Sequence, residues 1–148
     1  MRTSTSNNLH DMARKASRDR SGKRVYLACP LPLFGTVRYA RAQRRVRERF
    51  RRALLLLPDQ LFANREAWLT GWHLVSRDLT DLVILTDGAG YVGRGTYDEV
   101  QSARAAGAHI WLLTPEDEWV TGEQLLFSTP NALDWRRYSR VTVRPAAE

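Results

Sequence analysis

Two predominantly apolar runs stand out in the second half of the chain, at Leu82–Thr86 and His109–Thr114. Each spans five or six residues, a length typical of strands that are buried on both faces of a parallel sheet. The first run is opened by Asp81 and closed by the turn-forming residues Asp87 and Gly88. The pattern therefore predicts two buried strands.

The residues between these runs have the periodicity of a helix, with Val100, Ala103 and Ala106 on one face. Thr96 is the predicted N-terminal cap, and Gly107 is suited to a left-handed helix end. Strand, helix and strand in this order predict a βαβ unit with parallel neighbouring strands. Ligands of such sheets bind at the carboxyl ends of the strands, so we expect a ligand near the start of this helix.

The first half of the chain also alternates between strands and helices. An amphipathic helix is predicted over 36–52, because its apolar residues form one stripe and its arginines lie opposite. The stripe consists of Tyr39, Ala42, Val46, Phe50 and Ala53. Strands are predicted at Val25–Cys29 and Leu54–Leu57, each followed by a proline, and a second helix at Asn64–Ser76.

After Thr114 the acidic segment PEDEWVTGEQ predicts a turn, 131–138 a small helix and 140–144 the last strand. The complete order predicts an α/β fold with a three-layer, flavodoxin-like (Rossmann-like) parallel sheet of about five strands and helices on both faces. We place this domain at 25–148. Residues 1–24 are polar, lack apolar periodicity and carry a net charge of +5, so we interpret them as a disordered basic arm.

The net charge of the 148 residues is +7, but it is unevenly distributed. Residues 36–52 carry +7 and residues 53–148 carry −5, and this acidic second half argues against nucleic-acid binding. With 21 arginines and two lysines in the chain, we interpret the arginine face of the helix as a solvated surface. Arg38 is the exception, because it lies nearest the loop after the first strand and is a candidate phosphate partner.

The remaining composition excludes several classes. Cys29 is the one cysteine, which excludes an internal disulfide framework and fits a reducing compartment, so we expect a cytoplasmic protein. No apolar run reaches the length of a membrane span, and no membrane association is expected. His73 and His109 have no further histidine or cysteine at a ligand spacing, so neither a metal site nor a cofactor is expected.

Candidate chemistry gathers where the first strand of the βαβ unit ends. The glycines there, which let the backbone approach a ligand, are Gly88, Gly90, Gly93 and Gly95. Glu99 lies about one turn into the helix and is a candidate nucleophile, although the helix dipole alone favours acids near this position. Trp68 and Trp72, one turn apart, are candidates for a base pocket or for the core.

Together these segments resemble the nucleoside 2-deoxyribosyltransferase-like family. The resemblance rests on a YLA-type first strand before a proline loop, a strand opened by Asp81, and the pattern G-x-G-T-x-x-E at Gly93–Glu99. It ends with A-x-x-x-G-A-x-I-W-L-L at Ala103–Leu113 and covers about 24–114. The resemblance implies enzymes that cleave or transfer at the N-glycosidic bond of nucleosides or nucleoside monophosphates.

The resemblance also implies roles for individual residues. Glu99 would attack the anomeric carbon of the sugar, and Tyr26 would position the nucleophile or the sugar, although Tyr26 also suits a core position. Two family acids fall on or near His73 and Gly93, which leaves Asp78 and Asp87 as replacements. The other predicted substrate-binding residues are Gly95, Thr96, Arg38 and Trp72.

Three alternatives remain open from the sequence. GRGTYDEV also resembles the lysine-decarboxylase-like nucleotide phosphoribohydrolases, but the Pro-Gly-Gly that precedes their motif is missing. A non-catalytic nucleotide-binding or sensing module of the same fold is the second alternative, and a nucleic-acid-binding protein ranks below it. Members of the resembled family often complete their sites across subunits, so a homo-oligomer is among the expectations.

Overall fold

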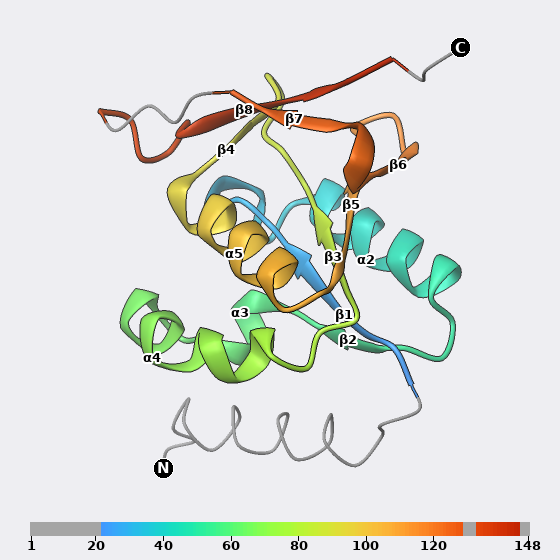
Figure 1. Cartoon of the computed structure of the whole chain (residues 1–148), viewed down its shortest axis with the longest axis vertical. Helices are drawn as coiled ribbons and strands as arrows, with labels where there is room; N and C mark the ends of the chain where they lie inside the picture. Colours follow the sequence, from blue (N-terminus) through green and yellow to red (C-terminus); the bar gives the residue numbers. More distant parts are fainter. Residues whose placement is uncertain (1–21, 129–132, 146–148) are drawn as a thin grey trace.

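The computed structural model describes residues 22–128 and 133–145 (Figure 1). The main sheet is formed by β1 (Arg24–Ala28), β2 (Leu54–Leu56), β3 (Asp81–Ile84), β5 (His109–Leu113) and β6 (Trp119–Thr121). The helices are α2 (Val37–Arg49), α3 (Pro58–Leu61), α4 (Arg65–Ser76) and α5 (Arg94–Ala105), with 3₁₀ turns η1 (Leu31–Leu33) and η2 (Gly122–Gln124). A second sheet holds β4 (Tyr91–Val92), β7 (Leu125–Phe127) and β8 (Ser139–Val143).

The main sheet has the strand order β2-β1-β3-β5-β6. Its first four strands are parallel, and the predicted βαβ unit is confirmed because α5 joins the parallel neighbours β3 and β5. The prediction of an entirely parallel sheet is wrong for β6, which pairs with β5 in the antiparallel sense. Only a short turn joins β5 to β6, whereas a parallel connection needs a crossover of roughly a dozen residues or more.

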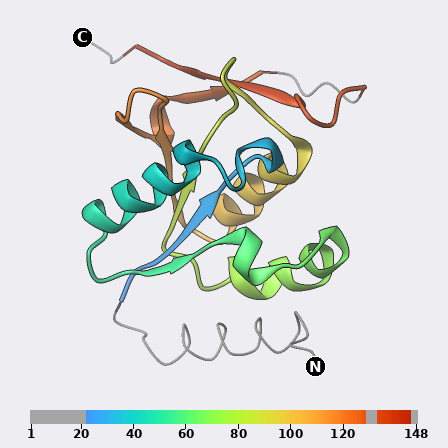
Figure 2. The same ribbon diagram turned by 180° about the vertical axis from the view of Figure 1, so that it is seen from behind.

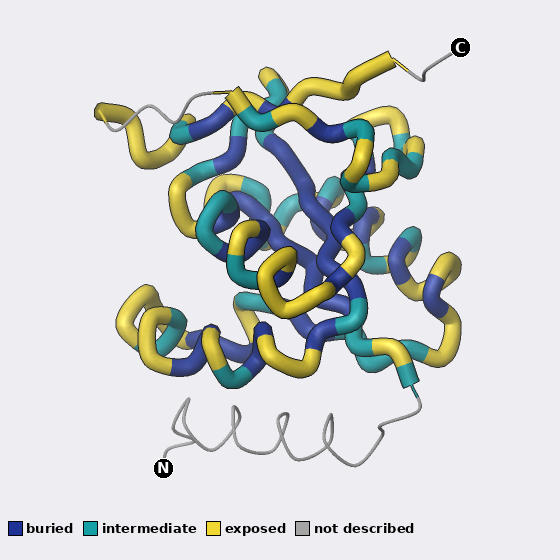
Figure 3. The backbone as a smooth tube through the Cα atoms, viewed as in Figure 1, coloured by how far each residue is buried: buried dark blue, intermediate teal, exposed yellow. Residues whose placement is uncertain are grey.

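Each face of the sheet has its own hydrophobic core, because successive residues of a strand point to opposite faces. Tyr26, Leu82 and Ile110 pack with residues of α4 and α5, whereas Val25 and Leu27 pack with residues of α2. Accordingly α5 lies in front of the sheet in Figure 1 and α2 in front of it in Figure 2. The central strands are buried along most of their length (Figure 3).

The predicted helix caps are confirmed at Asn64 and Gly107 but not at Thr96, and α2 ends at Arg49, before its predicted end at 52. Asn64 caps α4 as predicted, because its side chain accepts a hydrogen bond from the Ala67 N–H at 2.9 Å. Gly107 ends α5 in the left-handed region, with φ of 90°. The predicted cap at Thr96 is wrong: α5 already begins at Arg94, whose N–H donates to the Trp135 carbonyl at 2.9 Å.

The small antiparallel sheet was not predicted. Its last strand, β8, was expected at 140–144 and is found one residue earlier, while the acidic segment expected to be a turn contains β6. Residues 133–138 form turns and bends instead of the predicted helix, and 131–132 lie outside the described residues. Of the predicted arm at 1–24, only 22–24 are described, and Arg24 already opens β1.

Candidate active site

The βαβ unit and the first strand bring together a buried acid and two hydrogen-bond donors. Glu99 of α5 is only 5% exposed. Its Oε2 accepts a hydrogen bond from the Tyr26 hydroxyl, and a second from Trp68 Nε1 at 2.8 Å. Three elements therefore meet at one carboxylate oxygen: β1, α4 and α5.

The local sequence explains why these groups meet. Tyr26 is the middle residue of β1 and points, like Ala28, to the face that α4 and α5 cover. Trp72 of α4 packs against it, with ring centroids 4.7 Å apart, and is therefore part of the core. Trp68 lies one turn earlier on α4, is partly buried, and directs its indole N–H to Glu99.

Burial determines the electrostatics of this cluster. It raises the pKa of Glu99 to about 7, although the hydrogen bonds from Tyr26 and Trp68 act in the opposite direction by stabilising the carboxylate. Burial and the nearby Glu99 raise the pKa of Tyr26 well above its usual value, so its hydroxyl stays protonated and donates. Near neutral pH, Glu99 therefore exists in both the protonated and the ionised form.

The two carboxylate oxygens of Glu99 have different surroundings. Oε2 accepts both hydrogen bonds, whereas Oε1 accepts none from the described residues. One oxygen is thus fixed, and the lone pairs of the other are not used by the described residues. A carboxyl group with a pKa near neutrality, held in this way, is chemically suited to nucleophilic or acid–base catalysis.

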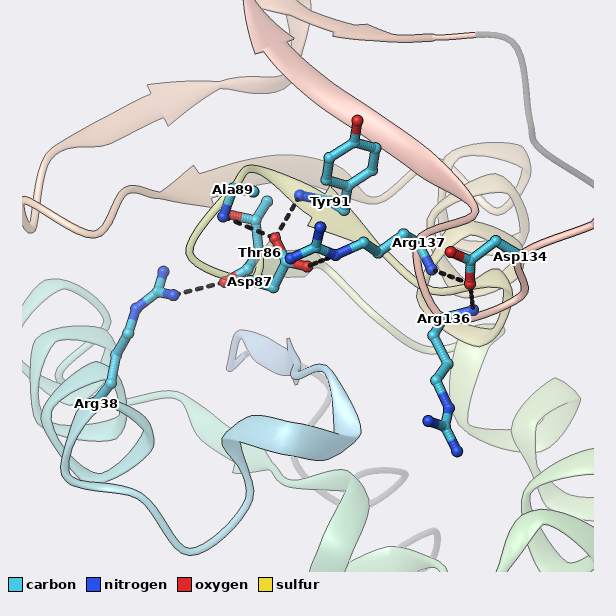
Figure 4. Close-up of polar contacts among 8 residues, drawn as sticks. All are labelled: Arg38, Thr86, Asp87, Ala89, Tyr91, Asp134, Arg136 and Arg137. Atoms are coloured by element: carbon cyan, nitrogen blue, oxygen red, sulfur yellow. Dashed lines mark hydrogen bonds and ion pairs between the residues drawn. The ribbon is translucent and has the colours of Figure 1, made fainter.

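A second group of polar residues lies where β3 ends (Figure 4). Arg38 Nη1 donates to the Thr86 carbonyl at 2.5 Å, from the first turn of α2. Asp87 Oδ1 accepts hydrogen bonds from the backbone N–H groups of Ala89 at 2.9 Å and Tyr91 at 3.0 Å. Asp87 Oδ2 forms an ion pair with Arg137 Nε at 3.0 Å. The predicted substrate-binding residues Arg38 and Asp87 therefore both lie at the carboxyl end of the sheet.

The predicted glycines and Thr96 line the start of α5. Gly93 is the N-cap residue, where an added Cβ would lie 3.2 Å from the Trp135 carbonyl oxygen. Gly95 is exposed, with open space around the position of a Cβ, and Thr96 is buried in the first turn. Gly93 thus has a packing reason to be glycine, whereas Gly95 has no packing reason in this structure.

Two predicted residues do not join the site. His73 of α4 is exposed, and no hydrogen bond of its side chain is found among the described residues. Asp78 is exposed in the turn before β3, at the amino end of that strand, whereas Asp87 follows the carboxyl end. The structure therefore does not place Asp78 beside Asp87.

Sequence reasoning missed three participants. The sequence predicts Trp68 as part of a base pocket or of the core, but not as a hydrogen-bond donor to Glu99, and it gives no signal for Arg137. Asp59 is the second residue of α3, shortly after β2, and accepts a hydrogen bond from the Tyr39 hydroxyl at 2.6 Å. Its position after a parallel strand was the available signal, because such positions lie at the ligand-binding edge of the sheet.

Other features do not add a reactive group. Burial raises the pKa of the Cys29 thiol, and Asp59 raises it further, so the thiol stays protonated. Among the described residues, no group of three or more His, Cys, Asp or Glu side chains is arranged to hold a metal ion. A surface hollow lined by Lys23, Phe50 and Trp111 lies at the amino ends of β1 and β2, and none of the predicted site residues lines it.

Comparisons with known proteins find no match for this chain among protein-family models, curated proteins or solved structures. Within residues 22–128 and 133–145, no helix combines the length and the apolar character that crossing a membrane requires.

Proposed function

We propose that this protein cleaves or transfers at the N-glycosidic bond of a nucleoside or nucleoside monophosphate, with Glu99 as the nucleophile. The observation that carries the proposal is the geometry of Glu99. It is a buried carboxyl group with one oxygen held by the Tyr26 hydroxyl and the Trp68 indole, and its other oxygen has no partner among residues 22–128 and 133–145. The resemblance of Gly93–Glu99 to the transferase-like family supports the same reaction.

The reaction begins with ionised Glu99. Its Oε1 attacks the anomeric carbon, a C–O bond forms as the C–N bond breaks, and the electron pair of the broken bond leaves with the base, which takes a proton from water. The transition state resembles an oxocarbenium ion. Water, or a second base, then attacks the same carbon and restores the carboxylate, so the sugar keeps its configuration.

Tyr26 and Trp68 are positioning residues in this mechanism. Their hydrogen bonds fix Oε2 and keep the pKa of Glu99 lower than burial alone would set it, so that a useful fraction is ionised at neutral pH. The chemistry requires no cofactor and no metal ion.

The fold supports this proposal at a coarser level. We propose that the parallel part of the sheet, in the order β2-β1-β3-β5, belongs to a flavodoxin-like three-layer arrangement, which would place the ligand at the carboxyl ends of β1 and β3. The cytoplasm and a homo-oligomer remain part of the proposal, on the grounds given by the lone cysteine and by the resemblance.

A non-catalytic nucleotide-binding module is the second candidate. The resembled family contains a further acid near the nucleophile, and in this chain its position falls near His73. The nearest acid, Asp78, is exposed at the amino end of β3, so the missing acid favours this candidate. This candidate predicts binding of a nucleotide without release of the base.

A panel assay separates the two functions. The protein is incubated with nucleosides and their monophosphates, and the free base is measured by chromatography. The enzyme hypothesis predicts base release that falls by about 10³-fold or more in Glu99→Gln and is unchanged in Glu66→Gln, an exposed acid on α4. Equal release by wild type and Glu99→Gln would refute it, and bound nucleotide without release would support the binding module.

A further inference from the structure

Two arginines approach the end of β3 from opposite sides. Arg38 reaches it from α2, and Arg137 reaches it from the segment that precedes β8. Figure 4 shows their guanidinium groups pointing toward each other across Thr86 and Asp87. Residues that are about a hundred positions apart in the sequence thus converge on one strand end.

Arg38 is held there without a counter-ion from the described part of the chain. Its Nη1 donates to the Thr86 carbonyl, while its Nη2 is buried and has no hydrogen-bond partner in the described part of the chain. No carboxylate of the described residues forms an ion pair with it. A guanidinium group has five N–H donors in a planar fork, so the arrangement leaves donors and a full positive charge for another acceptor.

Arg137 does have a counter-ion, but the surroundings remain positive. Its Nε contacts Asp87 Oδ2 at 3.0 Å, and its guanidinium lies 5.3 Å from the centre of the Tyr91 ring. Arg140 lies over the same ring, at 6.0 Å. The charged residues named at this end of the sheet are four arginines and three acids, an excess of one positive charge: Arg38, Arg136, Arg137, Arg140, Asp59, Asp87 and Asp134.

The location is the part of the sheet where a ligand is expected. The connection that leaves β1 leads to β2 on one side, and the connection that leaves β3 leads to β5 on the other side. The two connections therefore diverge between β1 and β3. Ligands of open α/β sheets bind in the crevice at such a point. The hydrogen bond from Arg38 to Thr86 links the helix that follows β1 to the end of β3.

We infer that Arg38 and Arg137 form a two-sided clamp for a phosphate ester on the sugar of the ligand. This inference rests on the proposed function and narrows its substrate class to phosphorylated nucleosides. Without ligand, Asp87 holds Arg137. When the phosphate binds, Nη2 of Arg38 donates to one phosphate oxygen, and Arg137 exchanges the Asp87 carboxylate for another.

The guanidinium chemistry favours a phosphate over other ligand groups. Its planar fork matches two oxygens of a phosphate, and each such charge-assisted pair is stronger than a neutral hydrogen bond. Arg137 lies outside the 24–114 stretch that resembles the transferase-like family, so this assignment does not follow from the resemblance. Because the two guanidinium groups converge on one point, they suit one phosphate group better than a chain of phosphates.

The test measures binding separately from catalysis. Ribose 5-phosphate, ribose and inorganic phosphate are titrated into wild type, Arg38→Gln, Arg137→Gln and the control Arg44→Gln, an exposed arginine of α2, by calorimetry. We expect ribose 5-phosphate to bind more tightly than ribose, and each clamp variant to bind it about tenfold or more weakly, with Arg44→Gln unchanged. Binding of inorganic phosphate with the same arginine dependence supports the clamp.

A fourth variant protects the test against loss of folding. Asp87→Asn retains the oxygen that accepts the turn N–H groups but removes the charge that competes for Arg137, so we expect tighter binding of ribose 5-phosphate. A purely structural role of these residues would not produce opposite effects. Equal affinity for ribose and ribose 5-phosphate, or Arg38→Gln and Arg137→Gln both binding like wild type, overturns the clamp.

Failure of the clamp and failure of the catalytic proposal give different results. Base release that is equally fast from nucleosides and monophosphates, and unaffected by Arg38→Gln, retains the catalytic role of Glu99 and overturns the clamp. Arginine-dependent binding of ribose 5-phosphate without any base release retains the clamp and overturns catalysis.

Discussion

Replacing Glu99 by Gln tests the electrostatic description of the site without any knowledge of the substrate. The variant keeps the shape of the side chain and retains an oxygen that can accept the hydrogen bonds of Tyr26 and Trp68, but it removes the ionisable group. Any pH dependence of folding that Glu99 contributes must therefore disappear in the variant.

The size of the effect follows from the burial of Glu99. Burial raises its pKa from the ordinary 4.5 to about 7, which at about 1.36 kcal/mol per pKa unit corresponds to about 3 kcal/mol. The folded state therefore binds this proton more tightly than the unfolded state. The free energy of unfolding of the wild type falls as pH rises from 4.5 to about 7, and the contribution of Glu99 is constant above that.

The assay is urea unfolding followed by tryptophan fluorescence, at several pH values between about 5 and 8. The free energy of unfolding of Glu99→Gln, minus that of the wild type, should increase by about 3 kcal/mol across this range. Other titrating groups cancel in the difference. Glu66→Gln, which changes an exposed acid, should show a constant difference. A constant difference for Glu99→Gln as well would refute the description of Glu99 as a buried acid.

Three further changes have defined outcomes. If base release is found, its kcat/KM should rise with pH through about 7 in the wild type as Glu99 ionises. In Tyr26→Phe the rise should move to higher pH, because the lost hydrogen bond stabilised the carboxylate; an unchanged pH profile would contradict this. Gly95→Ala should raise the free energy of unfolding by up to about 1 kcal/mol, since the position is exposed and helical and has room for a Cβ. A lower free energy of unfolding, measured by urea unfolding, would contradict this. Gly122→Ala should lower the free energy of unfolding by about 1–3 kcal/mol in the same assay, because the added Cβ would lie 2.8 Å from the Ile110 carbonyl oxygen. An unchanged urea midpoint would contradict this close packing.

The parallel part of the fold could be predicted because its signals are local. The apolar runs of β3 and β5 and the amphipathic stripe of α2 are each explained by burial at one periodicity. The cap at Asn64 and the left-handed end at Gly107 follow from backbone chemistry at single residues.

Apart from β8, the antiparallel strands could not be predicted in the same way. β4 has two residues and β6 and β7 have three each, which is too short for a recognisable alternation of apolar and polar positions. The start of α5 was misplaced because its first N–H is satisfied by the Trp135 carbonyl, a contact from the distant C-terminal segment that no local pattern records.

The candidate site could likewise be predicted only in part. The resemblance paired Tyr26 with Glu99, and the structure joins them by a hydrogen bond, while their catalytic roles remain predictions. The donor role of Trp68 and the approach of Arg137 depend on how α4 and the C-terminal segment pack, so spacing in the sequence could not identify them.

Peptide mapping of an acid-quenched reaction shows whether Glu99 carries the sugar during the reaction. The protein is mixed with the substrate that releases base fastest, quenched during turnover, digested and examined by mass spectrometry. We expect the mass of the sugar on the peptide that contains Glu99, and no such mass in Glu99→Gln. A sugar attached to another residue, or the same adduct formed by Glu99→Gln, would contradict it.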